Sequence, residues 1–387
     1  MRRVVFLLAL AVLATPAFAT WSIVAVDTET QEVGVASATC VTNIDLKAFL
    51  PAIVVGVGGG AAQSQVDGSG VRRQTMVNGF NNGLTSAEII AQLEAISGSA
   101  FHQNGVARVA GDSGTFSGAT TFAFSDGVTG SFGNVHYAIQ GNILTGEPVL
   151  TEAELALINT AGDLPEKLMA SMEAARAMGG DGRCSCSPAN PTGCGAPPMS
   201  FTKAADVGFV LLARFGDTDD PTCNASGCAD GDYYLDLNVA NQSTGDVDPV
   251  IQLRGLFDTW RMDLENRPDA VQSTVTFAPD GDDRLLTLEL VDWRGLALGF
   301  GGATVTVEHA PGSAGYSGIG AVVDQGDGTY EVSLTGNGGS GTDIFLVTID
   351  DGIRPVVIPP QRASLDLAIF GDGFESGDTT AWSSTVD

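Results

Sequence analysis

The chain has 387 residues, which is room for two domains or for one large domain with an appendage. It carries 46 Asp and Glu residues against 18 Lys and Arg residues, giving a formal net charge of -28 at pH 7. Such a charge repels phosphate backbones and anionic membranes, and this argues against nucleic-acid binding. No apolar run of roughly 18 residues follows Thr20, so we expect no membrane span in the mature protein.

The first 19 residues have the pattern of a secretory signal peptide. Arg2 and Arg3 form a charged start, an apolar run follows, and Ala17 and Ala19 supply the small residues of an A-x-A cleavage site. Cleavage after Ala19 leaves Thr20 as the first residue of the mature chain. The sequence therefore predicts export to the periplasm or the extracellular space.

Thr20 is a candidate nucleophile because of where this cleavage leaves it. A threonine at a free N-terminus holds a nucleophile and a base in one residue, since its α-amine can take the proton of its own hydroxyl. The pKa of a free α-amine is about 7.7–8.0, which suits proton transfer at neutral pH. The alternative is that Thr20 merely follows the cleavage site.

Strands and helices alternate through the first part of the mature chain. Two β-rich runs, 20–27 and 33–38, predict a hairpin in which Asp27 begins the turn. Thr85 and Glu88 have the spacing of a helix capping box. The other predicted elements are an apolar strand over 49–57, helices over 70–81 and 86–96, and strands over 105–110, 115–124 and 136–142.

Two further helices, two strands and a closing helix follow. We expect the helices over 151–160, 164–178 and 248–264, and the strands over 207–214 and 233–239. Runs of strands alternating with runs of helices indicate α+β layers. Two stacked sheets, each covered outside by helices, use all these elements, so we predict a four-layer αββα sandwich over residues 20–266.

The composition changes after Pro268. Alternating strands separated by Gly/Asp turns predict a small immunoglobulin-like β-sandwich over residues 271–358. These strands are expected at 273–278, 285–292, 303–309, 329–335 and 343–350. Residues 359–387 are interpreted as a polar C-terminal tail, Gly/Asp/Ser-rich over its last part.

Five of the six cysteines lie between residues 184 and 228, and the sixth is Cys40. In an exported protein disulfides are favoured, although Cys184-x-Cys186 and Cys223-x4-Cys228 also have spacings seen in zinc sites. The spacing does not determine the connectivity, and Cys40 either pairs at a distance or stays unpaired.

A threonine nucleophile needs hydrogen-bond donors for an oxyanion and a charge that tunes its amine. The backbone N–H groups of Gly59, Gly60 and Ala61, interpreted as a turn after the third strand, are the oxyanion candidates. Lys47 precedes that strand, and its charge would lower the pKa of a nearby amine or hydroxyl. The alternatives are a flexible turn for the glycines and a solvated loop residue for Lys47.

Two further places hold candidate substrate-binding groups. His102 stands at a strand entrance, where it can orient a substrate. Asp181 and Arg183 follow a helix stop, and the pair either organises a loop or places a guanidinium that clamps a substrate carboxylate.

Five segments together resemble one protein family: TWSIVAVDTETQEVGVASA from Thr20, then VGVGGGAAQSQV, HQNGVARV, YAIQGNILTG and GGDGRCSCSPANPTGCG. They resemble the domain-of-unknown-function 1028 family over residues 20–262, and that family is similar to the N-terminal nucleophile (Ntn) hydrolases. The resemblance implies an αββα fold and amide-bond hydrolysis. It gives Thr20 the nucleophile position and sets His102, Gln103, Asn142 and Asp181 on family motifs.

The chain departs from the family pattern at one motif. The family commonly reads GGDRRG where this chain has GGDGRCSC, so Gly182 replaces a basic residue beside Arg183. This departure weakens the transfer of a two-arginine substrate site. The tail GDGFESGDTTAWSS looks like a C-terminal motif repeated on bacterial exported proteins.

The sequence therefore predicts an exported Ntn-type amidohydrolase that acts on a small amide or a peptide-like substrate without a metal or cofactor. The alternative is a non-catalytic binding or surface-associated module with a degenerate Ntn-like core. A metal-dependent hydrolase is disfavoured because the three histidines are scattered along the chain. The oligomeric state is not indicated.

Overall fold

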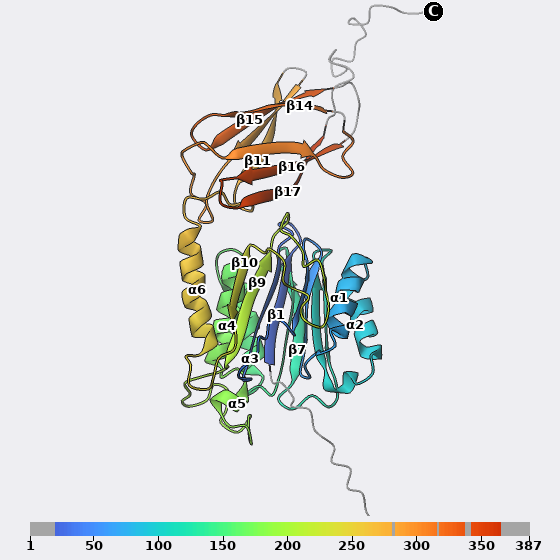
Figure 1. The fold of residues 1–387 in the computed structure, drawn as a ribbon, viewed down its shortest axis with the longest axis vertical. Coiled ribbons are helices and arrows are strands. Elements are labelled where there is room, and N and C mark those ends of the chain that lie inside the picture. The colour runs from blue at the N-terminus through green and yellow to red at the C-terminus, as the bar shows by residue number, and fades with distance from the viewer. Residues whose placement is uncertain (1–19, 281–282, 316, 337–341, 365–387) are drawn as a thin grey trace, which may run out of the picture. The chain divides into compact units, whose positions relative to one another are not determined.

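The computed structural model describes residues 20–280, 283–315, 317–336 and 342–364 (Figure 1). The predicted signal peptide and most of the predicted tail lie outside the described residues. The chain divides into two compact units, residues 1–258 and 259–387. The division falls within helix α6 (Pro249–Asp263), on the N-terminal side of the boundary expected from composition.

Two antiparallel sheets form the centre of the N-terminal unit. The six-stranded sheet has the order β10-β9-β2-β1-β8-β7, and the four-stranded sheet has the order β3-β4-β5-β6. Their strands are β1 (Thr20–Asp27), β2 (Val33–Thr39), β3 (Pro51–Val54), β4 (Gly58–Gln63), β5 (Gln103–Arg108), β6 (Asp112–Ser117), β7 (Asp126–Phe132), β8 (Val135–Asn142), β9 (Val207–Ala213) and β10 (Leu235–Val239). The predicted hairpin is confirmed, because β1 pairs with β2 in antiparallel register.

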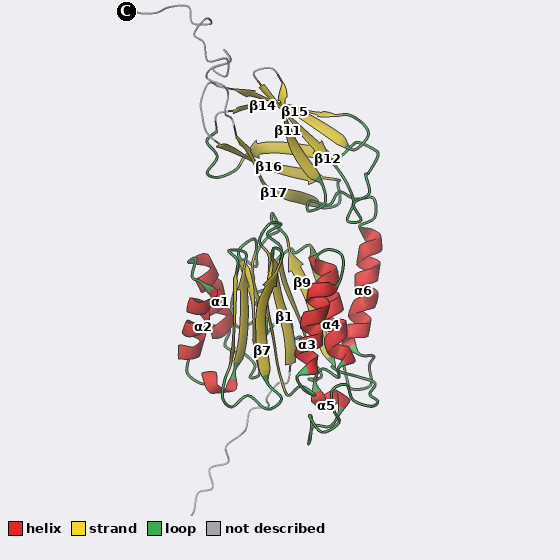
Figure 2. Ribbon diagram, turned by 180° about the vertical axis from the view of Figure 1, so that it is seen from behind, coloured by secondary structure: helices red, strands yellow, loops and turns green. Residues whose placement is uncertain are grey.

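Helices cover the outer face of each sheet (Figures 1 and 2). The pair α1 (Val71–Asn81) and α2 (Ser86–Ala95) packs on the four-stranded sheet, and the pair α3 (Pro148–Asn159) and α4 (Leu164–Ala177) packs on the six-stranded sheet. Two short helices are η1 (Ser99–Phe101) and α5 (Gly182–Ser185). The layer order is helices, sheet, sheet, helices, so the expected mixture of helices and antiparallel sheets is confirmed.

Local sequence signals set the start of α2 and the turn after β1. Thr85 Oγ1 accepts a hydrogen bond from Glu88 N at 3.2 Å, and Glu88 Oε2 accepts one from Thr85 N at 2.8 Å. The predicted capping box is therefore present. Asp27 Oδ1 accepts hydrogen bonds from the N–H groups of Glu29 and Thr30, as expected for a residue that begins a turn.

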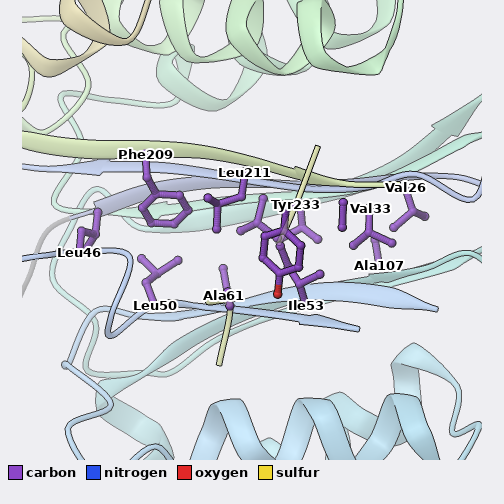
Figure 3. Close-up of a cluster of buried hydrophobic side chains, with 14 of the residues drawn as sticks. Val26, Val33, Leu46, Leu50, Ile53, Ala61, Ala107, Phe209, Leu211 and Tyr233 are labelled. Atoms are coloured by element: carbon purple, nitrogen blue, oxygen red, sulfur yellow. The ribbon is translucent and has the colours of Figure 1, made fainter. Parts of the chain in front are cut away.

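An apolar core fills most of the space between the two sheets (Figure 3). Val24, Val26, Val33 and Val35 enter it from the six-stranded sheet. Ile53, Ala61 and Ala107 enter it from the opposite sheet, and Phe209, Leu211 and Tyr233 also belong to it. Burial of this apolar area stabilises the contact between the sheets.

The glycine run corrects one prediction. The segment 58–63 is strand β4, and the expected single strand over 49–57 is the shorter β3 followed by a turn. A Cβ on Gly59 would lie 2.9 Å from Val33 Cγ1 across the sheet interface, and a Cβ on Gly60 would lie 2.7 Å from Met76 Sδ on the helix side. Glycine is required because β4 packs closely against a layer on each face.

The strand expected over 115–124 is also wrong. The chain forms β6 up to Ser117 and then β7 from Asp126. Strand β7 is poor in buried side chains because it is the edge strand of its sheet, and this weakens the alternating pattern by which a strand is recognised.

The C-terminal unit is all-β over its described residues beyond α6. One sheet has the order β11-β12-β15-β14 and the other β13-β16-β17. The strands are β11 (Thr274–Asp280), β12 (Asp283–Glu289), β13 (Thr304–His309), β14 (Ser317–Asp324), β15 (Thr329–Gly336), β16 (Thr342–Asp350) and β17 (Pro355–Ser364). A buried apolar cluster that includes Leu288, Val332 and Phe345 is drawn from both sheets.

Two strands of this unit were not expected from the sequence, β14 and β17. The prediction that the tail begins at residue 359 is wrong, because β17 pairs with β16 as far as Ser364. Two consecutive prolines within β17 hide it from strand patterns, and an edge strand tolerates them. No helix within the described residues has the length and apolar character to cross a membrane.

Candidate active site at the start of β1

Thr20 opens a central strand of the six-stranded sheet, between β2 and β8. Thr39 and Asn142 are its partners in register on the two sides. Side chains of a strand alternate between its faces, so Thr20 and Ser22 share the face of Val24, which lies in the core between the sheets. The side chain of Thr20 thus belongs to the face directed at the second sheet, and the residue is buried.

Polar residues occupy this end of the sheet interface, in contrast to the valines further along. Ser22 lies in register with Ser37 and Gln140, two residues along β1 from Thr20 and on the same face. On the second sheet Gln63 of β4 lies in register with Gln103 of β5. These residues are at most 3 % exposed, so they form a buried polar layer between the sheets.

Hydrogen bonds join the two sheets across this polar layer. Gln63 Nε2 donates to the carbonyl oxygen of Thr20 at 3.0 Å and to Gln103 Oε1 at 2.7 Å. Ser22 Oγ donates to Gln63 Oε1 at 2.5 Å and accepts from Gln140 Nε2 at 2.6 Å. The peptide group that follows Thr20 is therefore held by a side chain of the opposite sheet.

Gln103 anchors the layer on its far side. Its Nε2 lies within hydrogen-bond distance of three acceptors: Ser117 Oγ at 2.7 Å, the carbonyl oxygen of Asp126 at 2.9 Å and that of Gly141 at 3.0 Å. Gly141 precedes Asn142, the register partner of Thr20, so Gln103 also fixes the end of β8. The structure thus brings together Thr20, Gln103 and Asn142 from the predicted site.

The segment 181–183 reaches the same end of the sheet. Thr39 and Asn142 are the register partners of Thr20, and the residues that follow them in sequence are Cys40 and Ile143. Cys40 N donates to Asp181 Oδ2 at 2.7 Å, and Gly182 N donates to the carbonyl oxygen of Ile143 at 3.0 Å. Asp181 therefore lies beside the rung that contains Thr20.

Asp181 is fully buried and its carboxylate has several donors. Besides Cys40 N, it accepts hydrogen bonds from the backbone N–H of Arg183 at 3.0 Å and from Arg183 Nη2 at 2.8 Å. Burial raises the pKa of Asp181 above its usual value, and the nearby charge of Arg183 counteracts only part of this rise. This arrangement favours the loop-organising interpretation of the pair.

The strand pairing of β4 does not favour the oxyanion role predicted for Gly59, Gly60 and Ala61. Strand β4 has a paired neighbour on each side, with β3 against one edge and β5 against the other. The backbone donors of an inner strand are used by these ladders, so they are not available to a substrate.

Lys47 is directed to a different group of residues. Its Nζ lies 2.6 Å from Asp236 Oδ2 and 3.4 Å from Asp230 Oδ1, and among the described residues its side chain makes no other ion pair. Burial lowers its pKa, but the hydrogen bond and charge of Asp236 outweigh burial and raise it. The interactions of Lys47 support neither its role beside Thr20 nor the solvated-loop alternative.

His102 follows the short helix η1 and directly precedes β5. Its neighbours are Arg72 and Asp67 at the start of α1. Burial, together with the charge of Arg72, lowers the pKa of His102 to about 4. The residue is therefore a neutral histidine under the helix layer, outside the polar layer that holds Thr20.

The six cysteines form three disulfides, Cys40–Cys184, Cys186–Cys194 and Cys223–Cys228. The disulfide interpretation is confirmed, and Cys40 pairs at a distance along the chain. The first bridge joins the end of β2 to α5, so it fastens the Asp181 segment beside Thr20.

Sequence reasoning missed three members of the polar layer, Ser22, Gln63 and Gln140. Ser22 was detectable, because it is the polar residue that shares a face with Thr20 in an otherwise apolar strand. Gln63 and Gln140 lie within two of the segments that resemble the family, but sequence reasoning assigned them no role, since their contacts depend on how the two sheets face each other. A buried ion pair between Asp67 and Arg73, 3.4 Å apart, was missed for the same reason.

Comparisons with known proteins agree with the family resemblance. Residues 20–189 match the family described as "Family of unknown function (DUF1028)", so the resemblance is confirmed over that range. The match ends before residue 262, which is the end of the range over which the resemblance was expected. No curated protein matches the chain.

Several solved structures are similar to the chain. The crystal structure of protein SPO2555 from Silicibacter pomeroyi, described with the family DUF1028, is 18% identical, with a TM-score of 0.46, over 62% of this chain and 88% of that chain. FdeC, an Escherichia coli adhesin, is 10% identical, with a TM-score of 0.18, over 66% of this chain and 57% of that chain. Yersinia pseudotuberculosis InvD is 11% identical, with a TM-score of 0.20, over 68% and 52% respectively.

Proposed function

We propose that the protein is an exported amidohydrolase of the Ntn type, whose nucleophile Thr20 is released by cleavage after Ala19. One observation carries this proposal: Thr20 is the first residue of a central strand, on the face directed at the second sheet, within a buried polar layer. A residue at that position offers its α-amine and its hydroxyl to the same substrate carbonyl once the preceding chain is removed.

The chemistry follows from the two groups of the N-terminal threonine. Thr20 Oγ attacks the amide carbonyl while the α-amine takes the hydroxyl proton through a water molecule. The same proton passes to the departing amine as the C–N bond breaks, which leaves an ester on Thr20. Water then attacks this ester and releases the acid.

In place of the glycine run, we assign to Asn142 the hydrogen bond to the carbonyl oxygen of the substrate. It lies in register with Thr20 on β8, and Cβ atoms of such partners are about 4.5–5.5 Å apart. An amide side chain supplies the hydrogen-bond donor that a developing oxyanion requires. Gln63 holds the Thr20 carbonyl oxygen, so it orients the nucleophile from the opposite sheet.

The finer fold assignments belong to the same proposal. The layer order of the N-terminal unit supports an Ntn-type αββα sandwich. The strand orders β11-β12-β15-β14 and β13-β16-β17 support an immunoglobulin-like C-terminal unit, since the constant-type immunoglobulin sandwich has the orders A-B-E-D and C-F-G.

The test begins with mass spectrometry of the exported protein, which identifies its first residue. Periodate cleaves the adjacent amine and hydroxyl of an N-terminal threonine, so an accessible Thr20 is detected as a loss of mass. A panel of small amides is then assayed with Thr20→Ala and with the matched control Thr28→Ala, which changes the same residue type at the turn after β1.

We expect hydrolysis to be lost in Thr20→Ala and kept in Thr28→Ala, with both variants folded. A mature chain that starts elsewhere, or full activity in Thr20→Ala, contradicts the proposal. A chain that starts at Thr20 but binds these compounds without cleaving them indicates the non-catalytic module instead.

A further inference from the structure

A carboxylate faces the two sulfurs of the disulfide beside Thr20. Asp206 Oδ2 lies 3.5 Å from Cys40 Sγ and 3.5 Å from Cys184 Sγ. Asp206 is 1 % exposed, and the two cysteine residues are half-buried. Among the described residues, these three side chains form the one group whose ligand atoms lie close enough together to hold a metal ion.

The distances match those of a tetrahedral zinc site. Zinc binds thiolate sulfur at about 2.3 Å and carboxylate oxygen at about 2.0 Å, which places sulfur and oxygen ligands about 3.5 Å apart at the tetrahedral angle. Asp206 Oδ2 already has this separation from both sulfurs. The bond between Cys40 and Cys184 must break, and their sulfurs must then move apart to the roughly 3.8 Å that separates two thiolates on a tetrahedral zinc ion.

The surroundings of Asp206 fix its orientation and balance its charge. Lys203 Nζ lies 2.5 Å from Asp206 Oδ1, which leaves Oδ2 directed at the sulfurs. Asp206 N donates to the carbonyl oxygen of Thr39 at 2.8 Å, so the backbone is held as well. Two thiolates and one carboxylate are neutralised by Zn²⁺ together with the Lys203 ammonium, and metal-binding carboxylates are commonly supported by such outer contacts.

We propose that Cys40, Cys184 and Asp206 form a zinc site when their disulfide is reduced. A small thiol reductant, RSH, converts the bridge to two cysteine thiols and is itself oxidised to RSSR. Zn²⁺ then displaces the two thiol protons and is bound by two thiolates and the carboxylate, with a fourth position open to water. Thiol–disulfide exchange with RSSR reverses the reaction: it restores the protein disulfide, returns two RSH and releases the ion.

Either state fastens the same elements. The disulfide and the zinc ion both connect the end of β2 to α5, so the Asp181 segment stays beside the Thr20 rung before and after oxidation. The other two disulfides have no carboxylate in such a group within the described part of the chain, and they are therefore suitable controls.

The experiment measures metal binding by the full mature chain. The protein is reduced with a phosphine under anaerobic conditions and titrated with Co²⁺, and zinc affinity is then measured by competition with a chromogenic chelator. The variants are C40S/C184S and Asp206→Asn, and the matched control is C223S/C228S. Circular dichroism and thermal unfolding report the fold of each variant.

We expect the reduced protein to bind one Co²⁺ with sulfur-to-metal charge-transfer and tetrahedral d–d bands, and the oxidised protein to bind none. C40S/C184S should lose these bands and C223S/C228S should keep them. Asp206→Asn should weaken zinc binding by about tenfold or more.

Three results overturn the proposal: equal metal uptake by reduced C40S/C184S, equal uptake by the oxidised protein, or a reduced protein that unfolds or binds no metal. None of these readouts depends on Thr20 chemistry. The variant Thr20→Ala should bind the metal normally whether or not the proposed hydrolase activity is correct.

Discussion

The two ends of the interface between the sheets differ in composition and in what each contributes. At one end the rungs of β1 and its neighbours hold Val24, Val26 and Leu211, which pack against apolar side chains of the second sheet. At the other end Thr20 and Ser22 meet glutamines that hydrogen-bond across the same gap. The apolar end can hold the sheets together without fixing a single geometry, whereas hydrogen bonds fix distances and directions.

This contrast suggests that the two ends of β1 have different roles, one in stability and one in holding polar groups. Burial of the valines supplies stability, and this leaves the start of β1 free to hold polar groups whose burial is costly unless they are paired. The polar layer meets most of that requirement with side chains from four strands, β1, β4, β5 and β8, although Gln140 Oε1 has no hydrogen-bond partner among the described residues.

The largest effect is expected at the apolar end. Leu211→Ala should lower the free energy of unfolding by about 2–5 kcal/mol, because it removes a fully buried side chain and leaves a cavity. Chemical denaturation measures the loss, and periodate reactivity of Thr20 should not change in the folded protein. The matched control Leu155→Ala, on the exposed side of α3, should cost less than about 1 kcal/mol. A small effect at Leu211 would contradict the assignment of stability to this end.

An effect of intermediate size is expected from the residue that precedes β5, His102, which is buried as a neutral group. Its pKa is about 4 in the folded protein and 6.5 in the unfolded chain, so the unfolded state binds a proton first as the pH falls. The stability contributed by neutral His102 is complete above pH 6.5 and is lost between pH 6.5 and about pH 4. The total loss is about 3 kcal/mol.

Denaturation curves of the wild type and of His102→Gln over this pH range test that expectation. The wild type should lose more stability than the variant as the pH falls, and the two proteins should have parallel profiles above pH 6.5. Parallel profiles over the whole range would show that His102 is not buried as a neutral group.

The smallest loss of stability is expected in the polar layer itself. Gln103→Ala should cost about 1–3 kcal/mol, since it leaves the Gly141 carbonyl oxygen and the Gln63 amide with fewer partners. The same change should alter the periodate reactivity of Thr20 in the mature protein, because Gln63 loses the partner that orients it. The control Gln92→Ala, on the exposed face of α2, should change stability by less than about 0.5 kcal/mol. If the periodate reactivity of Thr20 is unchanged in Gln103→Ala, the polar layer does not orient Thr20.

The sequence predicted the local elements well and the glycine segment badly. The hairpin, the capping box and most of the helices depend on residues that are close in sequence, so a single sequence is enough to predict them. The run Gly58–Ala61 has the composition of a turn, yet it forms an inner strand because flanking layers leave no space for larger side chains. Local composition contains no information about that space.

The candidate site also has features that the sequence predicts and features that it does not predict. Thr20, its position at the start of a strand and the face that it shares with Ser22 follow from the sequence and the alternation of a strand. The partners Gln63, Asn142 and Asp181 are set by strand pairing and sheet stacking, as is the Cys40–Cys184 bridge across a separation of 144 residues. The sequence by itself identified Thr20 as the candidate nucleophile and its place at the start of a strand. The tertiary structure decided which groups surround it, because contacts between distant segments depend on register and packing that no local pattern encodes.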